Sequence, residues 1–226
     1  IPIHLITSIP SLETYNNIKN KKYLKTVLNK RYENHPLPKS EVIDLNLESL
    51  NKKSISNKTI KIVEEYLKKN NQILFFLNRR GYAPFLICKK CGYRHICPNC
   101  SIYLTYHKIL NKIICHHCGY KSSSNRKCLD KKNFCDFSFY GPGVEKVFEE
   151  LKGIFPNKVI KIFSSDYLNK KKQSENLINE ISDEKIDILV GTQMISKGFN
   201  FPKLNCIVVV DADFTGKGYD LRTTEK

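Results

Sequence analysis

Three pairs of cysteines, each separated by two residues, lie in the middle of the chain. They are Cys88/Cys91, Cys97/Cys100 and Cys115/Cys118. A C-x2-C pair puts two thiolates on one tight turn, where both can bind one tetrahedral zinc ion, and two such pairs complete a structural zinc site. A glycine follows the first and third pairs and permits the tight turn, whereas the middle pair lacks it. Disulfides are the alternative, but we see no signal peptide, and a reducing cytosol favours metal.

Composition limits the classes of partner. The chain has 226 residues, is 41% hydrophobic and carries a formal net charge of +16. This charge favours an anionic partner such as nucleic acid. A Lys-rich coding bias is the competing explanation, so the charge supports the assignment without proving it. No apolar run approaches the roughly 18 residues of a membrane span, so we expect no membrane partner.

The spacing of apolar residues predicts an α/β fold. Helices are predicted over residues 60–69, over 144–154 and around 177–181, and strands over residues 73–77, 159–163, 186–190 and 207–210. Shorter strands are predicted over Ile3–Thr7 and Val42–Leu45. Alternating helices and strands are typical of a parallel sheet. The cysteine block is therefore expected to be inserted between the strand at 73–77 and the helix near Val144.

Polar residues follow two of the predicted strands. Gly191-Thr192-Gln193 comes directly after a buried strand, and Lys197-Gly198 follows it. In a doubly wound sheet this is the carboxyl edge, where ligands bind. Asp211-Ala212-Asp213 ends the next strand. These carboxylates are candidates for magnesium, but we favour a capping role.

Five segments, in this order along the chain, resemble one protein family. They are Ile9-Pro10-Ser11-Leu12-Glu13, Leu77-Asn78-Arg79-Arg80-Gly81-Tyr82-Ala83-Pro84, Gly141-Pro142-Gly143-Val144-Glu145, Gly191-Thr192-Gln193-Met194-Ile195-Ser196-Lys197-Gly198 and Asp220-Leu221-Arg222-Thr223-Thr224-Glu225. With the cysteine block between the second and third, they resemble the PriA family of primosomal replication-restart helicases (primosomal protein N′). The resemblance runs over nearly the whole chain.

The resemblance implies a fold and a function. It implies a RecA-like P-loop helicase lobe, with a parallel sheet and an inserted cysteine-rich zinc-binding module. The full-length protein would be an ATP- and magnesium-dependent 3′→5′ DNA helicase that recognises stalled or branched replication forks and restarts replication by primosome assembly. Its expected partners are branched or single-stranded DNA, other primosome proteins and single-strand-binding protein, and its expected location is the cytoplasm, with the nucleoid.

The resemblance also implies a domain division. Residues 1–57 would be the end of lobe 1 and a linker, 58–87 the start of lobe 2, 88–135 the zinc module, and 136–226 the remainder of lobe 2. The chain would then end just before the family's arginine-finger motif.

The family pattern implies roles for individual residues. Cys97, Cys100, Cys115 and Cys118 would share an inner zinc, and Cys88, Cys91 and Cys128 an outer one. The eighth ligand position falls on Lys131, which cannot bind zinc as an ammonium, and Cys135 is the candidate replacement. We therefore expect one to two zinc ions. The DNA contacts are expected at Arg79, Arg80, Tyr82 and Arg94, and motor coupling at Gly191, Thr192, Gln193, Lys197 and Gly198.

Parts of a motor are absent from the sequence. There is no G-x-x-x-x-G-K-[ST] loop to hold ATP phosphates and no D-E-x-H motif. We therefore expect no ATPase activity from this chain alone. The alternatives are a stand-alone zinc-bearing module that binds DNA or a partner, and the product of a degraded gene, which Ile9 and Lys131 would fit.

Overall fold

The computed structural model describes residues 3–7, 9–30, 32–34, 36–47, 54–77, 81–83, 85–123, 137–165, 167–168, 171–196 and 199–212. The described residues up to Val42 belong to one compact unit, and a second unit begins at Ile43. No helix in these ranges is long and apolar enough to cross a membrane.

The described residues of the first unit have little regular structure. Helix α1 (Leu12–Lys19) begins where the Ser11 hydroxyl accepts a hydrogen bond from the Thr14 N–H at 3.2 Å. A single 3₁₀ turn, η1 (Tyr32–Asn34), follows. The strand predicted over Ile3–Thr7 was wrong, because these residues are exposed and form no strand. An apolar run becomes a strand only when it finds a pairing partner, and the described residues supply none here.

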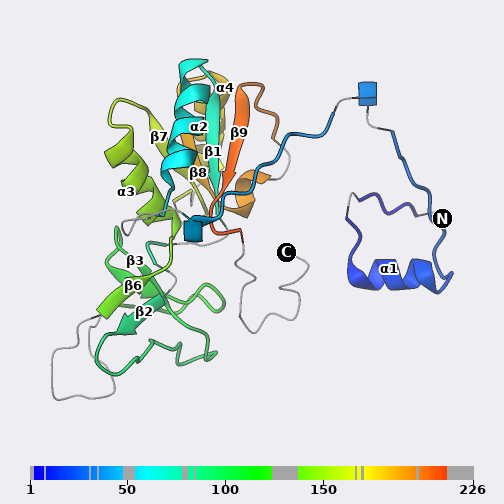
Figure 1. Cartoon of the computed structure of the whole chain (residues 1–226). Helices are drawn as coiled ribbons and strands as arrows, with labels where there is room; N and C mark the ends of the chain where they lie inside the picture. Colours follow the sequence, from blue (N-terminus) through cyan, green and yellow to red (C-terminus); the bar gives the residue numbers. More distant parts are fainter. Residues whose placement is uncertain are drawn as a thin grey trace. The chain divides into compact units, whose positions relative to one another are not determined.

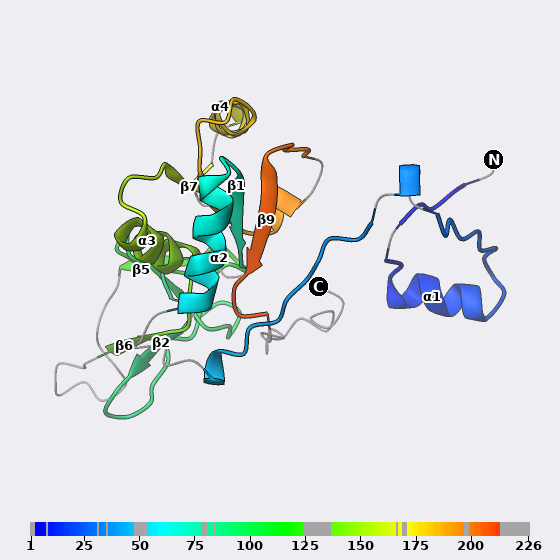
Figure 2. The ribbon, with the colours of Figure 1, turned by 45° about the horizontal axis from the view of Figure 1, so that its top comes forward.

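The second unit holds a parallel sheet covered on both faces (Figures 1 and 2). Its strands are β1 (Gln72–Phe76), β7 (Ile160–Phe163), β8 (Ile188–Gly191) and β9 (Leu204–Val209), in the order β7-β8-β1-β9. The helices are α2 (Asn57–Lys68), α3 (Val144–Ile154) and α4 (Lys171–Ser182), with the 3₁₀ turns η2 (Leu45–Leu47) and η3 (Gln193–Ser196). The predicted parallel α/β sheet is confirmed. The strand predicted over Val42–Leu45 was wrong, since Leu45 instead opens η2.

Alternating side chains along the strands build two cores. Ile73 and Phe75 of β1 pack with α2 and α3, whereas Leu74 packs on the other face with α4. This alternation is what a strand buried on both faces requires. Buried Gln72 is satisfied because its side-chain amide donates to the carbonyls of Ile181 and Ile186, each at 2.9 Å. We call this sheet with its helices the α/β lobe.

The cysteine block forms a separate antiparallel module at one end of the lobe (Figure 1). Strand β2 (Phe85–Cys88) pairs with β6 (Phe137–Tyr140), and β3 (Thr105–His107), β4 (Lys112–Ile114) and β5 (Lys121–Ser123) form a three-stranded sheet. The chain leaves the lobe after β1 and returns at α3, so the predicted insertion is confirmed. Residues 85–123 are called the cysteine module below.

Candidate metal centre and sheet edge

The three C-x2-C pairs adopt one backbone geometry. In each, the carbonyl of the first cysteine accepts the N–H four residues later, at 2.9–3.0 Å, from Gly92, Ser101 and Gly119. Each of these three residues has a positive φ, +70° and +77° at the glycines and +58° at Ser101. Ser101 thus adopts the left-handed conformation for which glycine is preferred, so the middle pair makes the same turn without one.

Two of these turns face each other and bring four thiols together. The Sγ atoms of Cys97, Cys100, Cys115 and Cys118 all lie within 4.8 Å of one another. The separations are 3.5 Å for Cys97–Cys118 and 3.4 Å for Cys100–Cys115. A disulfide needs about 2.05 Å, whereas a tetrahedral ion with Zn–S bonds of about 2.3 Å puts its sulfurs about 3.8 Å apart. The four thiols therefore fit zinc and not disulfides.

The surroundings shift the pKa values of two of these thiols in opposite directions. At Cys115 burial raises the pKa, but the N–H groups of Cys118 and His117 hydrogen-bond to the sulfur and outweigh it, so the pKa falls to about 7. Burial raises the pKa of Cys100 to about 12, against a smaller opposing effect of the Ile102 N–H. Metal binding must therefore displace protons from thiols as well as capture a thiolate.

The structure describes two of the four predicted ligands of the outer zinc site, Cys88 and Cys91. Cys88 is buried and Cys91 exposed, and the turn that carries them matches the other two. Cys128, Lys131 and Cys135 lie outside the described residues. The outer zinc therefore stays a prediction.

The predicted sheet-edge residues lie where a parallel sheet binds ligands. Gly191 ends β8, Thr192 is buried just beyond it, and Gln193 opens η3 with its side chain exposed. The Leu77 N–H donates to the Gly191 carbonyl at 3.0 Å. Leu77 directly follows β1, so the chain leaves the lobe for the cysteine module beside this edge of the sheet. Lys197, Gly198 and Asp213 lie outside the described residues.

Comparison with known proteins identifies the metal centre. Residues 97–122 match the family model described as "PriA DNA helicase Cys-rich region (CRR) domain". The chain is 41% identical to the replication restart protein PriA of Rickettsia felis over 99% of this chain and 35% of the relative. It is 35% identical to that of Haemophilus influenzae and 33% to that of Bacillus subtilis, over 100% of this chain and 31% and 28% of those relatives.

The chain belongs to the PriA family. It spans about a third of the length of these PriA relatives. The family match falls on the four clustered cysteines, so the zinc-binding character of this PriA segment rests on sequence and geometry together.

The predicted DNA contacts of this PriA segment differ in their surroundings. Arg94 is exposed, with its guanidinium carbon 5.4 Å from the centre of the Tyr103 ring. Tyr82 is half-buried against Tyr106, and the Lys108 ammonium lies 4.9 Å from its ring centre. Arg79 and Arg80 lie outside the described residues. All four roles in DNA binding stay predictions.

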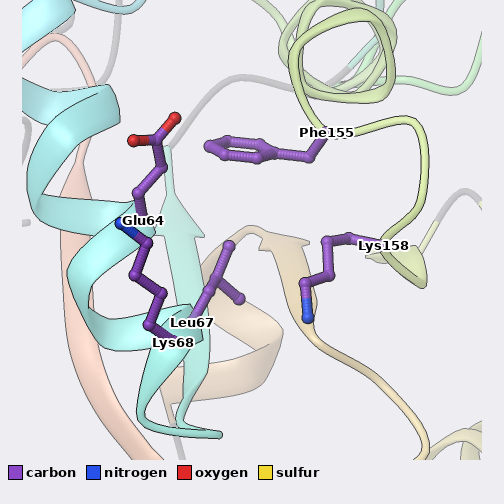
Figure 3. Close-up of a pocket in the computed structure, with 5 residues that line it drawn as sticks. All are labelled: Glu64, Leu67, Lys68, Phe155 and Lys158. Atoms are coloured by element: carbon purple, nitrogen blue, oxygen red, sulfur yellow. The ribbon is translucent and has the colours of Figure 1, made fainter.

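A shallow pocket lies away from these residues. It has a volume of about 210 Å³ and is lined by Glu64, Leu67, Lys68, Phe155 and Lys158 (Figure 3). Glu64, Leu67 and Lys68 lie in the last turns of α2, before β1, whereas Phe155 and Lys158 lie between the end of α3 and the start of β7. The pocket therefore lies at the amino edge of the sheet, opposite the edge where doubly wound folds bind ligands.

Proposed function

We propose that this chain is the zinc-bearing lobe of a replication restart protein that binds branched or single-stranded DNA at stalled forks. The whole protein would act as an ATP-dependent 3′→5′ helicase and assemble the primosome with its partner proteins and single-strand-binding protein. Within it, the α/β lobe would be a RecA-like lobe that serves an ATP and magnesium site completed by other parts of the protein. The names of the relatives and of the matching family model support this proposal.

The charge of the cysteine module is the observation that carries the DNA-binding part. Residues 85–123 contain six lysines and arginines and no aspartate or glutamate. All six cationic side chains are exposed: Lys89, Lys90, Arg94, Lys108, Lys112 and Lys121. The module stays cationic after allowance for the two negative charges of a zinc ion held by four thiolates. A surface of this kind attracts a phosphate backbone.

The position of the module supports the motor part of the proposal. It leaves the sheet at the carboxyl end of β1, next to Gly191 and Thr192. DNA held by the module would thus lie near the edge at which a parallel sheet binds ligands. A stand-alone zinc module has no need of a parallel sheet with such an edge, so this arrangement favours the restart protein over that alternative.

The two arginines that follow β1 provide the test of this interface. If Arg79 and Arg80 bind phosphates, the double change Arg79→Ala with Arg80→Ala should reduce the slope of log affinity against log salt by about 0.9 for each duplex phosphate that the two side chains neutralise. Fluorescence anisotropy with a labelled fork across a salt series measures this slope. The zinc content should stay unchanged. An unaltered slope in a folded double variant would assign the arginines to structure.

A further inference from the structure

A line of polar contacts joins the cysteine module to the α/β lobe, buried at its centre and at the lobe end and exposed at His116. Its central residue is His107, at the end of β3, whose side chain is 0% exposed. The Nδ1 atom of His107 lies 3.2 Å from a carboxylate oxygen of Glu145. Its Nε2 atom lies 3.0 Å from Nε2 of His116. Both ring nitrogens therefore have a polar neighbour, with a hydrogen bond at Nε2 and an ion-pair contact without hydrogen-bond geometry at Nδ1.

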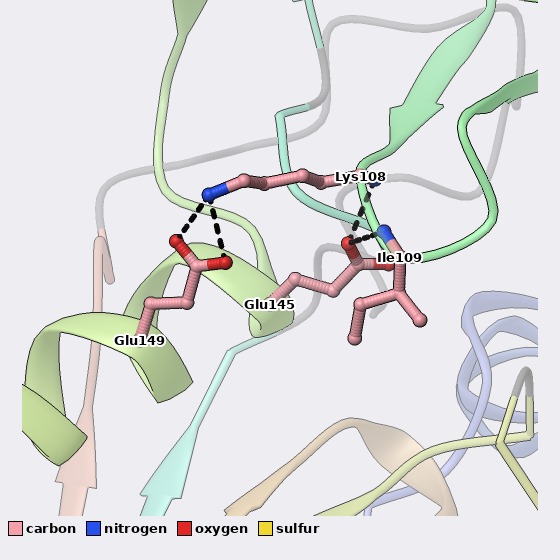
Figure 4. Close-up of polar contacts among 4 residues, drawn as sticks. All are labelled: Lys108, Ile109, Glu145 and Glu149. Carbon is pink, nitrogen blue, oxygen red and sulfur yellow. Dashed lines mark hydrogen bonds and ion pairs between the residues drawn. The ribbon is translucent and has the colours of Figure 1, made fainter.

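Glu145 belongs to the lobe, not to the module. It is the second residue of α3, and its side chain is only 1% exposed. Its other carboxylate oxygen accepts the N–H groups of Lys108 and Ile109, at 2.9 and 3.3 Å (Figure 4). Burial raises the pKa of this carboxyl, but the contacts with His107, Tyr167 and the Ile109 N–H outweigh it and hold the pKa below its usual value. A buried carboxylate is costly without such partners, so its position depends on the module.

His116 connects the line to the metal centre. It lies between Cys115 and Cys118, inside the turn that supplies two of the four thiols. That turn is closed by the hydrogen bond from the Gly119 N–H to the Cys115 carbonyl, at 3.0 Å. A zinc ion bound to both cysteines would fix the same turn and with it the backbone that carries His116.

We propose that Glu145 and His107 couple zinc binding at the four-cysteine site to the docking of the cysteine module on α3. Zinc would fix the turn that carries His116, and the His116 ring would then position the His107 ring. His107 in turn provides the ion-pair contact of the buried Glu145 carboxylate. The coupling is reciprocal, since a group that favours docking only in the zinc-bound state must strengthen zinc binding by the same factor. The three side chains are positioning residues. The inference rests on the zinc site but is independent of DNA binding.

The chain offers a matched control for each variant. His117 lies next to His116 in the same turn and is exposed. Glu149 lies one turn after Glu145 on α3, and its carboxylate binds the Lys108 ammonium at 2.7 and 2.9 Å on the exposed surface (Figure 4). The variants His116→Ala and Glu145→Gln therefore compare with His117→Ala and Glu149→Gln.

Zinc release to the chromogenic chelator 4-(2-pyridylazo)resorcinol, measured on the full chain, tests the proposal. We expect His116→Ala and Glu145→Gln to release zinc about tenfold faster than the unaltered chain, within the usual range of coupling between sites. The two control variants should stay within about twofold of it. The effect of Glu145→Gln is decisive, because in the described part of the chain Glu145 is connected to the His116 side chain through His107. If Glu145→Gln folds and releases zinc no faster than Glu149→Gln, the proposal is wrong.

Hydrogen exchange tests the reverse direction and does not need a variant at Glu145 to fold. The variants are compared with zinc bound, because removal of zinc would unfold the cysteine module and speed exchange throughout it. In the zinc-loaded His116→Ala chain the Lys108 and Ile109 amides, which donate to Glu145, should exchange faster than in the zinc-loaded His117→Ala chain. Equal exchange of these two amides in the two zinc-loaded variants would overturn the proposal. A purified chain without zinc would instead refute the metal centre itself.

Discussion

Replacing Cys100 with serine should abolish zinc binding at the four-cysteine site and unfold the cysteine module. A serine hydroxyl does not replace a thiolate ligand, and structural zinc contributes about 10–16 kcal/mol of apparent binding free energy to small domains. The core of the module cannot offset that loss, because it is small and includes two of the ligands themselves, Cys97 and Cys115. Elemental analysis and circular dichroism measure the two effects.

Cys206 supplies the control for this change. It is a free thiol on β9, half-buried and outside the four-cysteine cluster. Cys206→Ser should keep the full zinc content, expected at one to two ions per chain. Cys135→Ser should lower a content of two to one if Cys135 completes the outer site. Equal zinc in the Cys100→Ser and Cys206→Ser proteins would exclude Cys100 as a ligand.

The second large effect is expected at Gly143, where the chain returns from the cysteine module to α3. A Cβ atom at Gly143 would lie 2.2 Å from the Gly81 carbonyl oxygen and 2.7 Å from that of Tyr82. Both atoms belong to the backbone of the segment that leads from β1 into the cysteine module, so the clash cannot be relieved by rotation of a side chain. Gly143→Ala should therefore lower the free energy of unfolding by about 3 kcal/mol, the upper part of the range for overpacked sites. Urea unfolding of the zinc-loaded protein measures this.

Gly153 lies in the same helix and gives the opposite expectation. A Cβ atom there meets nothing within 4 Å. Gly153→Ala should raise the free energy of unfolding by about 0.5–1 kcal/mol, because alanine favours a helix more than glycine does. If Gly143→Ala and Gly153→Ala have the same free energy of unfolding, the segment at Gly143 does not contact the segment at Gly81 and Tyr82.

The sequence predicted those helices and strands whose pattern of apolar residues lies within the element itself. The apolar periodicity of α2 and α3 and the apolar runs of β1 and β8 are local, and the structure has all four elements. The C-x2-C spacing likewise predicted the tight turns and a zinc site made of two pairs, because two residues between cysteines fix one turn, whereas the choice of the two pairs that share the site came from the family resemblance. Strand order was not predictable in this way. The order β7-β8-β1-β9 depends on which strands pair in space, and no short segment records it.

The contacts between lobe and module were missed for a related reason. Glu145 and His107 are far apart in sequence, and neither belongs to a metal-ligand spacing. A signal was present, however, since Glu145 lies beside Val144 and Val147 on the buried face of α3. A charged residue at a core-facing position indicates a buried partner. Ser101 was a similar case, because the missing glycine after Cys100 already required a residue with positive φ.

The central claim is that the cationic cysteine module is the DNA-binding face of a replication restart protein. Its most direct test is fluorescence anisotropy with a labelled forked DNA, comparing two variants that each lose five positive charges. In one, Lys89, Lys90, Arg94, Lys112 and Lys121 of the module become glutamine. In the other, five exposed lysines of the lobe do: Lys61, Lys69, Lys152, Lys161 and Lys172.

The module variant should bind the fork at least about 100-fold more weakly at roughly 50 mM salt, and its salt slope should fall by up to about 4.5, because each neutralised duplex phosphate contributes about 0.9 to the slope. The lobe variant has the same net charge and should stay within about threefold of the unaltered chain. Equal losses of affinity in the two variants, or unaltered binding by the module variant, would contradict the claim that the module is the DNA-binding face.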